Sequence, residues 1–351
     1  MLNVKDELIV VEEQNQLDRK DMLTVIQEAG GCDGPIETVQ TSTGTQQIML
    51  PDWKRKRLEN QQYRLVGNHS AVKICHWCKA AVRGNQGCYK DTFYGVETDK
   101  CLEMSPAITC NKRCLHCWRD TTVFSRGWIG VVDDPKFIVE GCIEERRKLL
   151  MGFKGNPAVN KEQFEDLLKP THAAISLTGE PCMYPRLPEM IDEFFEHDFK
   201  TVFLVTSGTV PERLRELNQL PTNLYISNEA YTKEMYKQLC LPVIENAWEN
   251  YLESLDIMRT MDTRTVMRIT CMQGKNMDNP QGFLHLIDRG QPKYIECKSY
   301  MHVGYSRERL SEKNMPAHKD IELFSKEIEA NSNYKIVDER EDSRIFLLKR
   351  S

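Results

Sequence analysis

Three cysteines, Cys110, Cys114 and Cys117, stand within eight residues of this chain, in the order C-N-K-R-C-L-H-C. Thiolate is the ligand that soft iron and zinc centres prefer, so this spacing indicates a metal site. A closed zinc site and a fully ligated iron–sulfur cluster both need four ligands. Three cysteines on a cubane cluster would leave one iron open for a substrate or cofactor. The spacing favours such a cluster, while a zinc site completed by His116 or a distant cysteine stays open.

A second set of cysteines lies upstream. Cys75, Cys88 and Cys101 are separated by twelve residues each, and Cys78 makes a C-x-x-C pair with Cys75. Four thiolates could form a zinc site, or three could hold a second open cluster while Cys78 takes no part. Lys90 follows Cys88 by two residues. An amine beside a metal centre could bind an anionic substrate or form a Schiff base with a carbonyl.

Composition describes a soluble protein with one large domain or two ordinary ones. The chain has 351 residues, of which 40% are hydrophobic and 28% charged. No apolar run reaches the ~18 residues of a membrane span, and the N-terminus does not resemble a signal peptide. The 13 cysteines are odd in number, which favours a cytoplasmic metal protein over a secreted disulfide framework. The net charge of −5 gives no general nucleic-acid signature, so RNA contact would need a local basic patch.

Alternating strands and helices must position these side chains. Predicted strands cover 173–177, 201–205, 224–226, 266–270 and 294–297, and predicted helices cover 135–150, 161–168, 187–197 and a segment after 211. This alternation implies a parallel sheet, open or closed into a barrel. Sites in such sheets form at the carboxyl ends of the strands, where Glu180, Ser207, Ser227 and Lys298 follow. A helix over 316–331 and short strands at 334–337 and 345–348 would form a terminal appendage.

The C-x-x-x-C-x-x-C loop, followed by Thr178-Gly179-Glu180 after the next strand, resembles the radical S-adenosylmethionine superfamily. That resemblance implies a partial (βα)6 TIM-like barrel and a [4Fe–4S] cluster on Cys110, Cys114 and Cys117. The open iron would chelate S-adenosyl-L-methionine, and the Gly-Glu segment would contact the amino group of this cofactor. On the same grounds we assign six residues to the cofactor: Thr178, Gly179, Glu180, Ser207, Ser227 and Lys298.

More closely, the chain resembles the tRNA 4-demethylwyosine synthase family. The matching stretches are 70–75 (SAVKIC), 88–90 (CYK), 93–95 (FYG), 117–119 (CWR) and 300–306 (YMHVGYS). The evenly spaced Cys75, Cys88 and Cys101 follow the family's second-cluster pattern, from which Cys78 is absent. Two departures affect the expected cofactor and substrate contacts. Ser207 stands where the family usually has Asn, and Glu229 stands where it has Asp.

The resemblance implies a lyase-type reaction with two [4Fe–4S] clusters. Pyruvate would condense with the 1-methylguanosine beside the anticodon of tRNA-Phe, giving the tricyclic 4-demethylwyosine of the wybutosine pathway. A radical from S-adenosylmethionine would remove hydrogen from the N-methyl group, and the pyruvate carboxyl carbon would leave. We prefer chelation of pyruvate by the second cluster, with Lys90 pairing electrostatically, while a Schiff base on Lys90 stays open.

Partners and organisation complete the expectation. We expect a cytoplasmic monomer of the stand-alone archaeal type, without a flavodoxin domain and therefore dependent on an external flavodoxin- or ferredoxin-type electron donor. The expected parts are an N-terminal extension (1–60), a second-cluster segment (61–105), the barrel (106–310) and a C-terminal helix with short strands (311–351). Arg113, Arg119 and the basic run 54–57 are candidates for phosphate contact, and Trp118 is expected to pack against the cluster.

Overall fold

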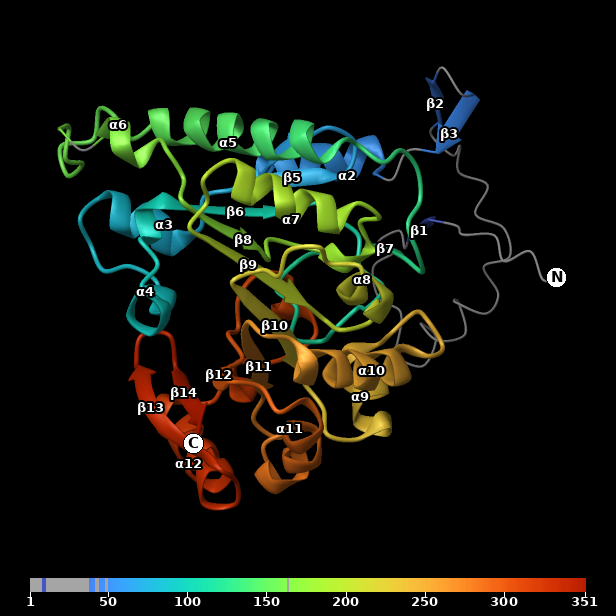
Figure 1. Cartoon of the computed structure of the whole chain (residues 1–351), viewed down its shortest axis with the longest axis vertical. Coiled ribbons are helices and arrows are strands. Elements are labelled where there is room, and N and C mark those ends of the chain that lie inside the picture. Colours follow the sequence, from blue (N-terminus) through green and yellow to red (C-terminus); the bar gives the residue numbers. More distant parts are fainter. Residues whose placement is uncertain (1–7, 11–37, 42–43, 48–49, 163) are drawn as a thin grey trace.

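A ten-stranded sheet organises the chain in a computed structural model that describes residues 8–10, 38–41, 44–47, 50–162 and 164–351 (Figure 1). Six strands of this sheet are parallel and follow one another in chain order. They are β6 (Cys101–Ser105), β8 (His172–Ile175), β9 (Thr201–Thr206), β10 (Asn223–Asn228), β11 (Arg264–Cys271) and β12 (Tyr294–Ser299). The predicted strands after residue 170 are therefore confirmed, and so is their parallel arrangement.

Antiparallel strands extend both edges of the parallel set. Beyond β6 lie β5 (Ser70–Lys73) and β4 (Arg64–Val66), and beyond β12 lie β14 (Ile345–Arg350) and β13 (Tyr334–Arg340). The two strands expected at 334–337 and 345–348 are present as β13 and β14, and they are joined to the sheet because β14 pairs with β12 from Tyr294 to Lys298. The same sheet contains strands from each of the three parts expected at 61–105, 106–310 and 311–351. The expected boundaries at residues 105 and 310 therefore do not separate independent sheets.

Helices after residue 130 follow the predicted positions. They are α5 (Pro135–Met151), α6 (Phe164–Leu167), α7 (Leu187–Glu196), α8 (Pro211–Arg215), α9 (Lys233–Cys240), α10 (Ala247–Thr260), α11 (Leu284–Gly290) and α12 (His318–Ala330). The longest, α5, begins where Asp134 accepts hydrogen bonds from the N–H groups of Lys136 and Phe137, with proline at its first position. Only one turn, α6, forms within the helix predicted over 161–168.

The remaining elements lie before the parallel strands or in the loops between strands. The helices are α2 (Asp52–Asn60), α3 (His76–Val82) and α4 (Tyr89–Tyr94), and the 3₁₀ turns are η1 (Thr98–Lys100), η2 (Pro181–Met183), η3 (Pro280–Phe283), η4 (Gly304–Glu308) and η5 (Glu312–Asn314). Two short antiparallel pairs join β1 (Leu8–Val10) to β7 (Val123–Ser125) and β2 (Thr38–Thr41) to β3 (Gly44–Gln47). Much of the expected extension 1–60 lies outside the described residues.

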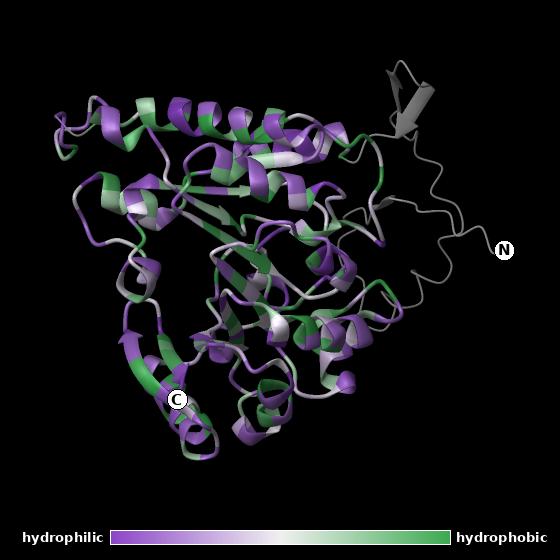
Figure 2. Cartoon of the chain, viewed as in Figure 1, coloured by the Kyte–Doolittle hydropathy of each residue, from purple (hydrophilic) through white to green (hydrophobic). Residues whose placement is uncertain are grey.

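Side-chain alternation along the parallel strands separates two faces. Leu204, Ile226 and Met267 pack in the main core with α7 and α10, whereas Phe203 and Tyr225 point to the opposite face. We call this second face the inner face. Hydrophobic residues concentrate along the strands, and hydrophilic ones on the outward sides of the helices (Figure 2). Among the described residues, no helix is long and apolar enough to cross a membrane.

Candidate active site

The loop that follows β6 carries the first set of cysteines. Cys110, Cys114 and Cys117 all have free thiols, and Cys114 interacts electrostatically with the other two. Burial raises the pKa of the Cys110 and Cys117 thiols, whereas a hydrogen bond with Cys240 lowers that of Cys114. Three neighbouring unpaired thiols are a donor set that suits a soft iron centre. In the described part of the chain, no group of three or more His, Cys, Asp or Glu side chains is arranged to hold a single metal ion.

Gly179 and Glu180 lie directly against this loop. The Glu180 N–H donates to the carbonyl of Thr109, at 3.0 Å, one residue before Cys110. Gly179 has φ of +68°, and a Cβ there would lie 1.9 Å from the carbonyl oxygen of Ala107. Only glycine allows this approach of two backbones. The structure therefore brings the predicted Gly-Glu segment to the cysteine loop.

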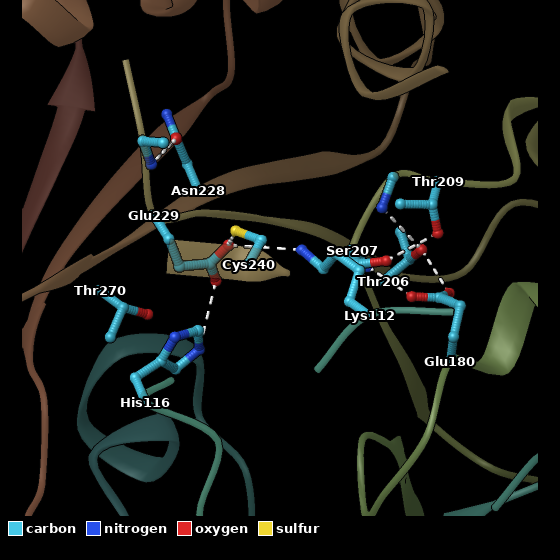
Figure 3. A network of polar contacts seen from close by, with 12 residues as sticks. Lys112, His116, Glu180, Thr206, Ser207, Thr209, Asn228, Glu229, Cys240 and Thr270 are labelled. Atoms are coloured by element: carbon cyan, nitrogen blue, oxygen red, sulfur yellow. Dashed lines mark hydrogen bonds and ion pairs between the residues drawn. The ribbon is translucent and has the colours of Figure 1, made fainter. Parts of the chain in front are cut away.

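The Glu180 carboxylate is buried and accepts three hydrogen bonds (Figure 3). Its Oε1 accepts from the Cys182 N–H at 3.0 Å and from the Thr206 hydroxyl at 2.6 Å. Its Oε2 accepts from the Ser207 N–H at 2.7 Å. Because a carboxylate offers about four acceptor positions, these donors orient Glu180 and leave room for one more donor, such as a ligand ammonium.

Three other predicted cofactor residues have different surroundings. Ser207 is buried, and its hydroxyl lies 2.9 Å from the hydroxyl of Thr209. The Thr209 hydroxyl donates to Asn111 Oδ1 at 2.8 Å, and this contact connects the end of β9 to the cysteine loop. The Thr178 carbonyl accepts from the Ser105 hydroxyl at the end of β6. Ser227 is half-buried in β10, on the same face as Tyr225.

A buried ionic network joins the cysteine loop to the end of β10 (Figure 3). Lys112 Nζ lies 3.4 Å from Glu229 Oε2, and His116 Nε2 lies 3.5 Å from Glu229 Oε1. Burial opposes ionisation of Glu229, but Lys112 and His116 outweigh it and hold the Glu229 pKa below its usual value. His116 thus lies beside a carboxylate through Nε2, while its buried Nδ1 has no hydrogen-bond partner among the described residues, so the zinc-ligand alternative stays open.

The second set of cysteines lies where α3, α4 and β6 begin. Cys75 precedes α3, Cys88 precedes α4, and Cys101 opens β6. Cys101 interacts electrostatically with both Cys75 and Cys88. Burial raises the pKa of all three thiols, to about 12 for Cys101. The structure thus gathers the three cysteines that the sequence spacing singled out.

Cys78 is buried in an apolar cluster that Cys75 also contacts, and its thiol interacts electrostatically with Cys75 and Cys101. Its side chain is 1% exposed among residues that include Ile74, Val82 and Leu150, and its thiol contacts the carbonyl of Asp99 at 3.8 Å. Burial raises the pKa of this thiol to about 11. These contacts support a packing role, although Cys78 shares one helical turn with Cys75.

Two lysines approach the second set of cysteines. Lys90 Nζ lies 4.6 Å from the centroid of the Phe203 ring on the inner face, and it lowers the pKa of the Cys88 thiol, which burial otherwise raises. Lys298 Nζ donates to the carbonyl of Ser343 at 2.7 Å and lies 5.4 Å from the centroid of the Tyr89 ring.

Burial and the neighbouring Arg268 lower the pKa of Lys298 to about 8. Its assignment to the cofactor stays a prediction, and its side chain contacts Tyr89, which follows Cys88. The reason for this contact is that Lys298 projects from β12 toward the inner face, where α4 covers the strands.

Sequence reasoning named Arg119 only as a candidate for phosphate contact and missed Arg268, although both side chains connect these parts. Arg119 interacts electrostatically with Cys117 of the first set and Cys75 of the second, and its guanidinium lies 3.9 Å from Glu103. It stands in the C-W-R stretch that carried the resemblance, so the signal was present. Arg268 pairs with the fully buried Glu296 at 2.8 Å. The sequence signal for this pair was a charged residue inside each of two mostly apolar strands, Arg268 in β11 and Glu296 in β12.

The basic run 54–57 has a structural role that differs from the expected phosphate contact. Lys54 is 3% exposed and pairs with Asp120 at 2.8 Å, and Arg57 lies 3.4 Å from the same carboxylate. Arg55 donates to the carbonyl of Asn68. The expectation is therefore wrong for Lys54, because its charge is neutralised in holding α2 to the segment after Cys117.

Comparisons with known proteins agree with this geometry. A family model described as "Radical SAM superfamily" matches residues 104–287, and one described as "Wyosine base formation" matches residues 289–350. The S-adenosyl-L-methionine-dependent tRNA 4-demethylwyosine synthase of Pyrococcus horikoshii is 43% identical over 311 residues, which cover 86% of this chain and 90% of the relative. The chain belongs to this synthase family. The synthase of Methanocaldococcus jannaschii is 37% identical and is covered over 96% of its length.

Solved structures place the fold in the same family. "Structure of TYW1 with a lysine-pyruvate adduct bound" matches with a TM-score of 0.79 and 35% identity, over 86% of this chain and 97% of that one. "Crystal structure of archaeal TYW1" matches with a TM-score of 0.71 and 32% identity, over 86% and 96%. The chain therefore has the α/β radical SAM fold, and its superfamily implies S-adenosylmethionine and a [4Fe–4S] cluster. The synthase of Homo sapiens is 34% identical and is covered over 42% of its length.

Proposed function

We propose that this enzyme condenses pyruvate with the 1-methylguanosine next to the anticodon of tRNA-Phe and so forms 4-demethylwyosine. Two [4Fe–4S] clusters would take part, held in a partial (βα)6 barrel by Cys110, Cys114 and Cys117 and by Cys75, Cys88 and Cys101. The observation that carries this proposal is the position of Arg119, whose guanidinium interacts with a cysteine of each set. Both sets would then border one site.

The first set and the segment from Thr178 to Glu180 would hold S-adenosylmethionine. When bound, this cofactor supplies the radical that removes hydrogen from the N-methyl group of the substrate. Glu180 offers its remaining acceptor position to the cofactor ammonium, while Ser207 and its hydroxyl partner Thr209 hold the neighbouring loop in place. Ser227, at the end of the next strand, would face the same ligand.

Lys90 would hold pyruvate. The name of the TYW1 structure with a lysine–pyruvate adduct favours a covalent link over the chelation that we preferred from the sequence. In that link, the Lys90 amine attacks the ketone carbon of pyruvate, and the ketone oxygen leaves as water. The Lys298 ammonium, which lies beside Tyr89, would pair with the pyruvate carboxylate. Two carbons of pyruvate then enter the product, and its carboxyl carbon leaves.

We further propose that the protein acts as a cytoplasmic monomer that receives electrons from a flavodoxin- or ferredoxin-type donor. The reaction itself is tested with protein whose iron and sulfide are reconstituted without oxygen. Incubation with dithionite, S-adenosylmethionine, pyruvate and methylated tRNA should yield the tricyclic base, detected by mass spectrometry of the digested RNA. If 5′-deoxyadenosine forms without a tricyclic base, the substrate assignment is wrong.

Reductive trapping separates the two lysines. Borohydride added to the enzyme with pyruvate should fix an adduct on the peptide that contains Lys90, and Lys90→Arg should abolish it. Lys298→Arg keeps a positive charge and should retain the adduct at Lys90. Trapping on Lys298 in the wild-type enzyme would exchange the two roles. Trapping on neither lysine would restore chelation as the mode of pyruvate binding.

A further inference from the structure

Trp118 is exposed beside the first set of cysteines. It directly follows Cys117, and 43% of its surface is accessible. Its expected packing against the cluster stays a prediction. Its backbone is held firmly, because its carbonyl accepts from the Tyr305 N–H at 3.1 Å. A Cβ on Gly304 would lie 2.4 Å from the same carbonyl, so η4 approaches the Trp118 backbone closely. The indole is thus presented to solvent by a rigid main chain.

One face of this indole is already covered. The guanidinium carbon of Arg119 lies 3.0 Å from the ring centroid, and Arg119 itself is only 8% exposed. The accessible area of Trp118 must therefore belong to the opposite face and to the ring edges. A cation on one face withdraws electron density from the ring, which favours an electron-rich purine on the other face.

The surroundings of Trp118 repeat the pairing of arginine with an aromatic ring. Arg57 lies 4.9 Å from the centroid of the half-buried Tyr305 ring, and the Tyr305 N–H is the group that donates to the Trp118 carbonyl. Arg309 adds another positive charge against the carbonyls of the cysteine loop. Aromatic rings interleaved with arginines are complementary to nucleic acid, which combines stackable bases with a negative backbone.

We propose that the free face of Trp118 stacks on an unpaired purine of the substrate RNA at the entrance to the site. This inference rests on the proposed function and assigns it a residue for RNA binding. A base that reacts at the cysteine loop must leave its stack, and a rigid indole beside that loop would replace part of the lost stacking. Trp118 would therefore contribute to RNA affinity and not to cleavage of the cofactor.

The test measures binding of a fluorescein-labelled anticodon stem–loop to the reconstituted enzyme by fluorescence anisotropy. Trp118→Ala should weaken binding ~10- to 100-fold, because removal of a base-stacking aromatic typically has this effect. Trp118→Phe should recover most of the affinity. Phe137→Ala is the matched control, because Phe137 is 54% exposed on α5 and should leave binding unchanged.

A second measurement assigns the stack to a base. Abasic nucleotides placed in turn along the loop should reveal one purine whose removal weakens binding to the wild-type enzyme but not to Trp118→Ala. Binding of Trp118→Ala within twofold of wild type, with iron content and uncoupled 5′-deoxyadenosine formation intact, would overturn the inference. Lower affinity that no abasic position reproduces would also overturn it. Formation of the tricyclic base by the wild-type enzyme is scored separately, so the proposed function can stand while this inference falls.

Discussion

The guanidinium of Arg309 donates to the backbone carbonyl of Cys117, 192 positions earlier in the chain. The same side chain reaches the carbonyl of Leu115 at 3.3 Å and the hydroxyl of Thr121 at 3.4 Å. Arg309 lies in the part of the chain that matches the wyosine-formation family model, outside the radical SAM match. The C-terminal segment therefore fixes the shape of the loop on which the first cluster would form.

Replacing Arg309 by Met should release this loop. A buried carbonyl that loses its donor costs about 1–3 kcal/mol, and this one side chain serves several groups. We expect Arg309→Met to lose the iron of the first cluster, about half of the roughly eight irons that two cubanes contain. Iron and sulfide analysis after anaerobic reconstitution measures this loss.

Arg307→Met provides the comparison for that experiment, because Arg307 is an exposed arginine two residues away in η4. It should keep its full iron content. Full iron together with normal 5′-deoxyadenosine formation in Arg309→Met would show that the loop holds its shape without this contact.

A methyl group on Gly179 should abolish cofactor binding. In Gly179→Ala the new Cβ would collide with the carbonyls of Ala107 and Thr109, at 1.9 and 2.6 Å, and push the Glu180 segment from the cysteine loop. Gly84→Ala shares the positive φ, +74°, but its Cβ would meet nothing within 4 Å. Both variants carry a backbone cost of about 1 kcal/mol. Only Gly179→Ala should lose S-adenosylmethionine binding in equilibrium dialysis, and equal affinities would contradict the close approach.

The sequence predicted those features that local pattern encodes. Short apolar runs marked strands β8 to β12, and the aspartate–proline pair at Asp134 marked the start of α5. Cysteine spacing identified both thiol sets, because ligands to one centre tend to be close in the chain. The Gly-Glu segment meets the loop of the first set because the carboxyl ends of parallel strands share one edge.

Long-range partners escaped this reasoning. The pairing of β14 with β12 depends on backbone groups far apart in sequence, which no local pattern specifies. Arg309 binds backbone carbonyls, and carbonyls carry no sequence signature. Lys54 stands in a charged run, and such runs usually face solvent. Lys54 is buried instead, and its ion pair with Asp120 offsets the cost of removing its charge from water. The contact of Lys298 with Tyr89 was not predicted, because the order of strands along the chain does not show which inner-face residues α4 covers.

His69 should make the stability of the protein depend on pH below neutrality. Its ring is fully buried, with Nδ1 2.5 Å from the carbonyl of Pro106 and Nε2 accepting from the Asp133 N–H at 3.0 Å. Burial lowers the His69 pKa, although the Asp133 carboxylate opposes this shift. The unfolded chain binds a proton near pH 6.5, whereas the folded protein stays neutral to lower pH. Stability is therefore complete above that pH and falls by up to about 1.4 kcal/mol per pH unit below it.

Thermal unfolding midpoints at pH 7.5 and 5.5 measure this dependence. His69→Gln, which can still donate to Pro106 and accept from Asp133 without titrating, should show a smaller drop between the two conditions than wild type. His285→Gln changes an exposed histidine on α11 and should keep the wild-type drop. An equal drop in His69→Gln would assign the acid sensitivity to other groups.

Removal of the Cys78 thiol should leave the metal content unchanged. Cys78 is 1% exposed among Ile74, Val82 and Leu150, so Cys78→Ala would open a small cavity that costs about 1 kcal/mol. Cys88→Ala, in contrast, removes a thiol from the set around Lys90 and should eliminate about half of the iron, together with product formation. Iron and sulfide analysis of both variants distinguishes a three-cysteine site from a four-cysteine one. Loss of metal from Cys78→Ala, with an unchanged thermal unfolding midpoint, would make the four-thiolate zinc arrangement the better interpretation, because the fold around the other three thiols would then be intact.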